Sequence, residues 1–169
     1  MKHASFPLVA FLALSGTAHA QVKPLQTFGD WQLICDVGSF GAYAPSGCAL
    51  GVSLESSDMP ERTMELSFYK SASGRLAFRL LTEPEHEEPA RLIFKEHGKP
   101  SVMYAPSSWK CADNACESGG EFSLNQKNEL IASHELKVVI PLPKDMFYTW
   151  TLETREMKAA LGRLDEVSR

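Results

Sequence analysis

Short runs in which apolar and polar residues alternate recur along most of this chain, separated by polar turns. In the run 63–69, Met64, Leu66 and Phe68 alternate with more polar neighbours. A period of two residues places successive side chains on opposite faces of a β-strand. The other runs of this kind lie at 31–35, 48–54, 76–81, 91–95, 101–104, 121–124, 136–142 and 147–152. This pattern predicts an all-β fold, a β-sandwich of about seven to ten short antiparallel strands.

The last segment of the chain has a different period. Met157, Ala160, Leu161 and Leu164 are spaced i, i+3, i+4 and i+7. This spacing places their side chains on one face of a helix. Thr154 lies where a residue that caps the helix N-terminus is expected. The sequence therefore predicts one short C-terminal helix that closes one end of the sandwich.

The N-terminus has the parts of a secretory signal peptide. A short positive region precedes the stretch 6–14, which is apolar apart from one proline. Ala18 and Ala20 supply the small residues of a cleavage site, so residues 1–20 are predicted to be removed after export. A membrane anchor would need about 20 consecutive apolar residues, and no later segment reaches that length either. We expect a single β-sandwich domain over 21–169 without a transmembrane segment, periplasmic or secreted.

Export would place the cysteines in an oxidising compartment, where an even number indicates structural disulfides. Twelve residues separate the first two cysteines and four separate the last two, so neither pair has the CxxC spacing of redox motifs and many zinc sites. Four cysteines allow three pairings, and the spacing alone does not choose among them. Turn-forming residues inside both intervals favour local pairing. The predicted disulfides are Cys35–Cys48 and Cys111–Cys116.

Several of these features occur together in one known family. The residues that carry the resemblance are Phe28-Gly29-Asp30-Trp31-Gln32, Cys35 and Cys48, the Cys111–Cys116 pair, and the Ala159-Ala160-Leu161 step of the closing helix. In this order they resemble the invasion-associated locus B (IalB) family, over about Thr27 to Leu164. The resemblance implies an exported, all-β bacterial protein, with Trp31 in the core and the four cysteines in two disulfides. It supplies no catalytic residues.

The chain differs from that family in its middle. Where such proteins tend to carry a glycine-rich apolar loop, this chain has the acidic run Glu83-Pro84-Glu85-His86-Glu87-Glu88-Pro89. Carboxylates beside an imidazole could bind a divalent cation. Because no fixed ligand spacing is present, we expect a solvated acidic loop instead, with no metal or cofactor.

The charge and the reactive side chains narrow the range of functions. The formal net charge of −4 argues against nucleic-acid binding, which needs a basic face. His86, His97 and His134 lie outside any recognisable catalytic motif, and no serine lies in GxSxG. We expect the aromatic residues 147, 148 and 150 to pack on a sheet face. For Phe40 and Tyr43 we expect a packed loop, with an exposed aromatic contact as the alternative.

Two classes of function are consistent with these features of the sequence. The first is a non-catalytic envelope protein that binds another envelope or host-side component through loops on a β-sandwich. The alternative is a periplasmic hydrolase that acts on envelope polymers with a pair of carboxylates. Glycosidase chemistry would need the pair about 5–5.5 Å or 6.5–9.5 Å apart. The acidic candidates are Asp30, Asp36, Glu121 and Asp145.

Overall fold

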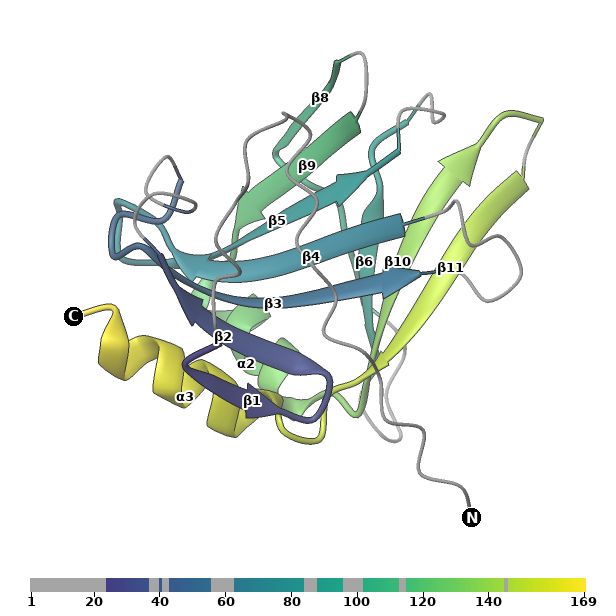
Figure 1. The fold of residues 1–169 in the computed structure, drawn as a ribbon. Coiled ribbons are helices and arrows are strands. Elements are labelled where there is room, and N and C mark those ends of the chain that lie inside the picture. The colour runs from purple at the N-terminus through teal and green to yellow at the C-terminus, as the bar shows by residue number, and fades with distance from the viewer. Residues whose placement is uncertain are drawn as a thin grey trace.

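A computed structural model shows two antiparallel β-sheets that face each other (Figure 1). The predicted signal peptide, His86, His97 and Asp145 lie outside the residues that the structure describes. The described residues are 24–36, 40, 43–55, 63–83, 88–95, 102–112, 115–144 and 146–169.

The larger sheet has seven strands in the order β1-β2-β3-β4-β5-β9-β8, and the smaller has four in the order β11-β10-β6-β7. The first sheet contains β1 (Gln26–Phe28), β2 (Trp31–Cys35), β3 (Cys48–Glu55), β4 (Thr63–Lys70), β5 (Leu76–Thr82), β8 (Ser108–Ala112) and β9 (Ala115–Glu121). The second contains β6 (Arg91–Lys95), β7 (Val102–Tyr104), β10 (Glu135–Leu142) and β11 (Met146–Glu153). The predicted all-β sandwich is confirmed, with eleven strands in the described residues instead of seven to ten.

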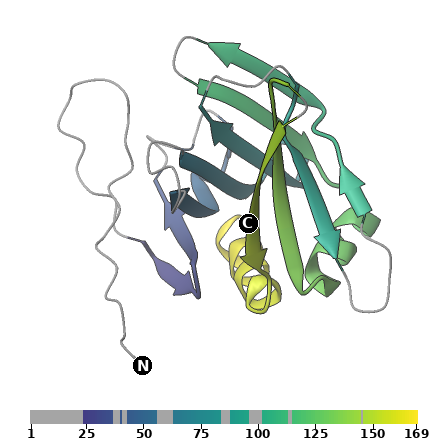
Figure 2. The same ribbon diagram turned by 90° about the vertical axis from the view of Figure 1, so that its right-hand side faces the viewer.

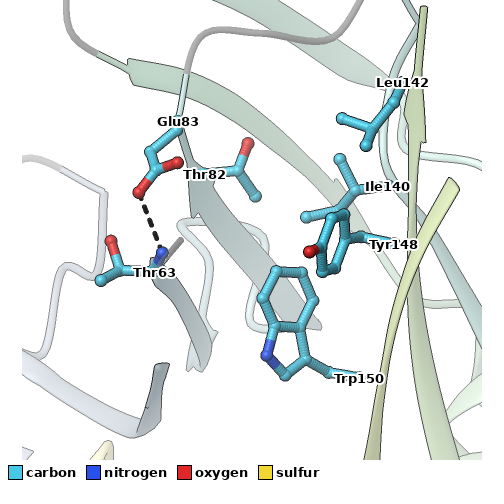
Figure 3. Close-up of a pocket in the computed structure, with 7 residues that line it drawn as sticks. All are labelled: Thr63, Thr82, Glu83, Ile140, Leu142, Tyr148 and Trp150. Carbon is cyan, nitrogen blue, oxygen red and sulfur yellow. Dashed lines mark hydrogen bonds between the residues drawn. The ribbon is translucent and has the colours of Figure 1, made fainter. Parts of the chain in front are cut away.

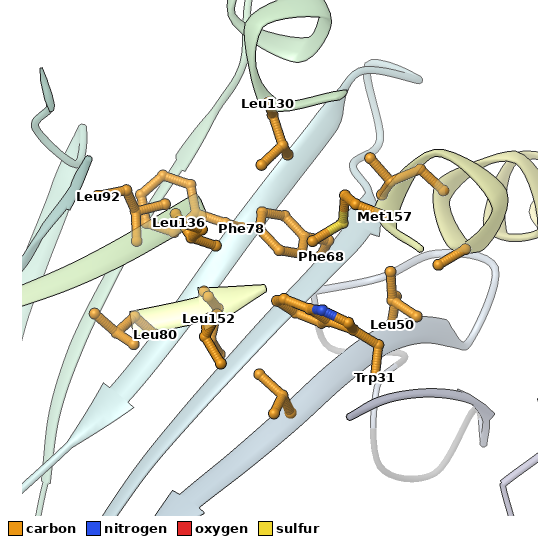
Figure 4. Close-up of a cluster of buried hydrophobic side chains, with 14 of the residues drawn as sticks. Trp31, Leu50, Phe68, Phe78, Leu80, Leu92, Leu130, Leu136, Leu152 and Met157 are labelled. Carbon is orange, nitrogen blue, oxygen red and sulfur yellow. The ribbon is translucent and has the colours of Figure 1, made fainter. Parts of the chain in front are cut away.

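The alternation seen in the sequence sorts side chains between the core and the outer faces. In β4, Met64, Leu66 and Phe68 are buried, while the residues between them are partly exposed. Trp31 is 2% exposed, and its ring centroid lies 5.5 Å from that of Phe68. Figure 4 shows side chains from both sheets and both helices meeting in this cluster. The expected core position of Trp31 is confirmed.

A second helix, α2 (Leu124–Ala132), follows where the alternation predicts a strand over 121–124. That predicted strand is wrong, because β9 ends at Glu121. Ser123 begins the helix with a capping box: its hydroxyl accepts the Gln126 N–H, and the Gln126 side chain accepts the Ser123 N–H. This motif satisfies two backbone donors that the first helical turn leaves unpaired. Figure 2 shows α2 at the same end of the sandwich as the C-terminal helix.

The predicted C-terminal helix is present as α3 (Met157–Val167), and its four predicted apolar residues are all buried. The prediction that Thr154 caps it is wrong. Thr154 is buried, and its hydroxyl donates to the Ser133 carbonyl at 2.5 Å. The N-cap position belongs to Glu156. A buried hydroxyl needs a partner, and the nearby end of α2 supplies one.

Both disulfides have the predicted local pairing. Cys35 and Cys48 are directly opposite in the β2–β3 register, and Cys111 and Cys116 are opposite in the β8–β9 hairpin. Each bridge therefore joins neighbouring strands close to the loop that connects them.

Asp165 on α3 forms ion pairs with residues of two other elements. Its carboxylate lies 2.7 Å from the Lys70 ammonium on β4 and 2.8 Å from the Lys127 ammonium on α2. Burial alone would raise the pKa of Asp165, but the hydrogen bonds from Lys127 and Lys70 outweigh it and lower that pKa. A lowered folded-state pKa contributes stability above the unfolded-state pKa, and this contribution is lost as the pH falls through the folded value.

We therefore expect Asp165→Asn to lower the free energy of unfolding at pH 7 by about 1 kcal/mol, because the ion pairs are partly exposed. The difference from wild type should shrink below about pH 4. Urea unfolding at both pH values measures it. Glu166→Gln is the control, since Glu166 is on the same helix in an exposed pair with Arg163. An equal decrease in the free energy of unfolding of both variants would contradict a stabilising role for the ion pairs of Asp165.

Candidate functional site

A groove opens between the two sheets at the end of the sandwich away from the helices. α2 leads into the start of β10, and β11 leads into α3, so both helices meet one end of this strand pair. The groove lies at the other end, near the turn that joins β10 to β11 (Figure 3). Its lining residues are Thr63, Thr82, Glu83, Ile140, Leu142, Tyr148 and Trp150.

The smaller sheet has fewer paired strands at this end of β10. β6 pairs with β10 only as far as Val139, which lies opposite Arg91. Beyond it, the described pairing of Pro141 and Leu142 is with β11 alone. Pro141 has no N–H to donate, so it suits a position with a partner on one side only. Ile140 and Leu142 thus face the groove from a two-stranded ribbon.

Two aromatic side chains of β11 line the groove. Tyr148 and Trp150 are two residues apart on one face of the strand, with ring centroids 5.5 Å apart and ring planes inclined by 32°. Both are partly buried against the core. Phe147 points to the opposite face and is 69% exposed. The predicted sheet-face packing is present for Tyr148 and Trp150, which also line the groove, but it is wrong for Phe147.

The opposite wall is more polar. Glu83 Oε1 accepts the Thr63 backbone N–H at 3.0 Å, which joins the end of β5 to the start of β4. The Thr82 hydroxyl donates to the Cys116 carbonyl at 3.5 Å, so Thr82 offers the groove chiefly its methyl group. Figure 3 shows these three residues across the gap from Ile140, Leu142 and Tyr148, with Trp150 between the two walls.

The groove is an open depression that encloses little space, since most of the volume between its walls is continuous with solvent. Glu83 is the one carboxylate among the lining residues, and none of them is a histidine. The arrangement offers apolar and aromatic surface with a single acidic group.

The structure does not bring the described acidic candidates together. Asp30 and Asp36 flank opposite ends of β2, which separates them by about 20 Å at the rise of an extended strand. Glu121 lies four strands across the sheet from Cys35, again about 20 Å from Asp36 at the usual strand spacing. Both separations exceed those that glycosidase pairs require.

The remaining candidates lie elsewhere. His134 is partly exposed before β10, and its backbone N–H donates to the Lys95 carbonyl. In the acidic run, Glu88 pairs with Arg91 at 2.9 Å, and residues 84–87 lie outside the described part of the chain. Within the part that is described, no three His, Cys, Asp or Glu side chains are grouped so that they could hold a metal ion.

The loop closed by the first disulfide packs against the outer face of the larger sheet. Phe40 is 8% exposed, and the Tyr43 ring lies edge-on to the Tyr69 ring at 4.8 Å. The Arg79 guanidinium lies 4.8 Å from the Tyr43 centroid and pairs with Glu117 at 2.9 Å. Burial raises the pKa of Tyr43, and the charge of Arg79 only partly offsets it. The expected packed loop is confirmed at these residues.

Most of the residues that line the groove are not marked in the sequence. The sequence distinguishes Glu83 only as part of the acidic run, and the aromatic residues of β11 only as a sheet face. Thr63, Thr82, Ile140 and Leu142 carry no signal of their own, because each is an ordinary strand residue. They become a site only where the ends of β4, β5, β10 and β11 meet.

The fold is similar to that of a solved protein, in the crystal structure of invasion associated protein B from Bartonella henselae. The TM-score is 0.61, and the alignment covers 84% of this chain and 96% of that chain at 19% sequence identity. At this identity the likeness establishes a shared fold. No protein-family model matches the chain, and no curated protein matches it in sequence.

This likeness agrees in fold with the family resemblance seen in the sequence. The two disulfides and the structural neighbour are consistent with an exported protein. Neither of the two described helices is long and apolar enough to cross a membrane.

Proposed function

We propose that this chain is a member of the IalB type that is exported with loss of residues 1–20 and acts in the periplasm or outside the cell. It binds another envelope or secreted component and catalyses no reaction. The shared fold, the local disulfides and the opening Phe28–Gln32 motif with its following cysteines support this proposal.

The observation that carries the binding role is the aromatic groove between the sheets. Tyr148 and Trp150 present partly exposed rings at the end of the sandwich where segments 56–62 and 84–87 leave the described strands. Aromatic side chains in a concave site are the residue types that most often anchor binding partners. The separation of the acidic candidates gives no comparable support to the hydrolase alternative.

Affinity capture from an envelope extract tests the proposal with matched variants. The test protein is the Tyr148→Ala/Trp150→Leu double variant, in which leucine retains part of the apolar volume that Trp150 packs against the core. We expect it to bind the partner captured by the wild-type protein about tenfold more weakly, as for loss of an interface anchor. Titration of the purified partner against each immobilised variant measures this change.

Phe147→Ala is the control, because it removes an aromatic ring from the same strand but from the opposite face. It should bind as the wild type does. Near-ultraviolet dichroism and cooperative urea unfolding establish that each variant is folded. Equal affinity of the folded double variant and the wild type would show that the groove does not bind the partner.

A further inference from the structure

We propose that the Cys111–Cys116 disulfide is a redox-sensitive switch that controls whether the edge strand β8 stays attached to the larger sheet. A dithiol reductant breaks the bridge and thereby releases β8 from β9, while the two sheets remain folded. This inference concerns the edge of the larger sheet opposite β1 and goes beyond the binding function proposed above, on which it does not depend.

β8 is attached to the sheet mainly through its neighbour β9. It is the last strand of the larger sheet and pairs with β9 on one side (Figure 1). All five of its residues are exposed, so none of them belongs to the buried core. The net gain from a backbone hydrogen bond is about as large as the conformational entropy lost when a residue is ordered. A strand that adds no apolar burial to its hydrogen bonds is therefore only weakly ordered.

Two attachments hold the ends of β8 on β9. At the start of the strand, the Gly119 carbonyl oxygen accepts the Ser107 N–H at 2.9 Å and the Ser108 hydroxyl at 3.2 Å. Towards the other end, Cys111 and Cys116 are directly opposite each other in the register and are joined by the bridge. The bridge is thus the covalent one of the two attachments, and its loss leaves that end of β8 to the backbone ladder.

The charged side chain between these attachments adds little. The Lys110 ammonium lies 4.0 Å from the Glu117 carboxylate, and the Lys110 side chain is 78% exposed. The same carboxylate oxygen lies 2.9 Å from the Arg79 guanidinium on β5. An exposed ion pair contributes little to stability, and here the closer partner of the carboxylate is on another strand. Lys110 therefore does not replace the bridge.

The two cysteines differ in their access to solvent, which decides where a reductant attacks. Cys111 is exposed, whereas Cys116 is fully buried. A thiolate of the reductant attacks the Cys111 sulfur and forms a mixed disulfide, and the Cys116 sulfur leaves as a thiolate that takes up a proton. The second thiol of the reductant then displaces Cys111 as a thiol. Two electrons pass to the protein, and the reductant leaves as a cyclic disulfide.

The two disulfides also differ in what they attach. The loop closed by the Cys35–Cys48 bridge includes Phe40 and Ala44, which are buried against the outer face of the larger sheet. The Cys111–Cys116 bridge attaches a strand whose five residues are all exposed. Its reduction therefore acts at the edge of the sheet, where β9 becomes the outermost strand and leaves one row of N–H and C=O groups unpaired.

Hydrogen–deuterium exchange followed by mass spectrometry tests the inference on the mature chain, residues 21–169. In the Cys111→Ala/Cys116→Ala variant, we expect the amides of residues 108–112 to exchange at least about tenfold faster than in the oxidised wild type, as for a locally opened strand. The amides of β4, in the middle of the same sheet, should keep their wild-type rates. Lys110→Gln is the matched control, because it changes a side chain of β8 and leaves the bridge intact. It should exchange as the wild type does.

A second measurement tests the redox step on the wild-type protein. Dithiothreitol is added under native conditions, and the free thiols are alkylated. No lysine or arginine lies between the members of either cysteine pair, so each pair stays within one tryptic peptide and each bridge is scored separately. We expect exchange of residues 108–112 to accelerate as the Cys111–Cys116 peptide becomes alkylated, and to slow again when the protein is reoxidised before alkylation.

Three results would overturn the inference. Unchanged exchange of residues 108–112 in the folded double variant would show that the backbone ladder holds β8 without the bridge. Faster exchange in β4 to the same extent would make the bridge a support of the whole domain, with no local release. Reduction of the Cys111–Cys116 bridge only after global unfolding would show that it does not respond to a reductant in the native protein.

Discussion

Replacing Trp31 by alanine is expected to lower the free energy of unfolding by about 3–5 kcal/mol, the usual range for a fully buried tryptophan. The ring is 2% exposed and lies against Phe68, and its indole N–H donates to the Glu153 carbonyl at 3.4 Å. The substitution removes apolar contact, leaves a cavity between the sheets and deprives that carbonyl of a donor. Since whole domains are stable by only about 5–15 kcal/mol, this is a large fraction of the total.

Urea unfolding followed by far-ultraviolet dichroism measures the effect. Phe147→Ala provides the comparison, because that ring is 69% exposed and its removal should change stability by no more than about 1 kcal/mol. An unchanged midpoint for Trp31→Ala would contradict the core position of this side chain.

Removal of the first disulfide is the second large effect. The free energy of unfolding of the Cys35→Ala/Cys48→Ala variant should be about 3 kcal/mol below that of the wild type. The reason is that the bridge closes a loop with a sequence separation of 13 residues and so lowers the entropy of the unfolded chain. The same loop also places Phe40 and Ala44 in a small cluster against the outer face of the larger sheet. Loss of the bridge therefore removes a covalent link and also frees a segment that buries apolar surface.

The second disulfide is the internal comparison. Its sequence separation is 5 residues, so the Cys111→Ala/Cys116→Ala variant should lose only about 2 kcal/mol. Denaturant titration of both variants without reductant gives the two values. A larger loss for the second pair would show that the β8–β9 hairpin, rather than the first loop, depends more on its bridge.

Three strands, β1, β8 and β9, lie outside the runs predicted from the sequence, and the structure gives a reason for the last two. All five residues of the edge strand β8 are exposed, so neither of its faces packs on the core and no alternation marks it. In β9, Gly119 and Gly120 suggested a turn. A Cβ at Gly119 would lie 3.0 Å from the Phe78 carbonyl oxygen, and one at Gly120 would lie 3.2 Å from the Ser107 nitrogen. These glycines permit close approach of neighbouring backbone, which is a tertiary requirement.

The second helix is a different case, since its signal was present. Ser123 and Gln126 have the spacing of a capping box, but only Leu130 is fully buried in the helix that follows. With such a narrow apolar face, periodicity gave little reason to expect a helix there. The polar residues 125–128 were instead interpreted as a turn.

The sequence by itself determined the all-β class, the C-terminal helix, the core position of Trp31 and the local disulfides. Each depends on neighbours in the chain: a period of two or of 3.6 residues, or turn residues between two cysteines. The groove depends on which strands pair and where each one ends. Thr82 and Trp150 belong to different sheets, and they line one groove because the two sheets pack with the ends of β4 and β5 opposite the β10–β11 strand pair. Alternation assigns a side chain to a face of its strand, but only packing of the two sheets decides what that face meets.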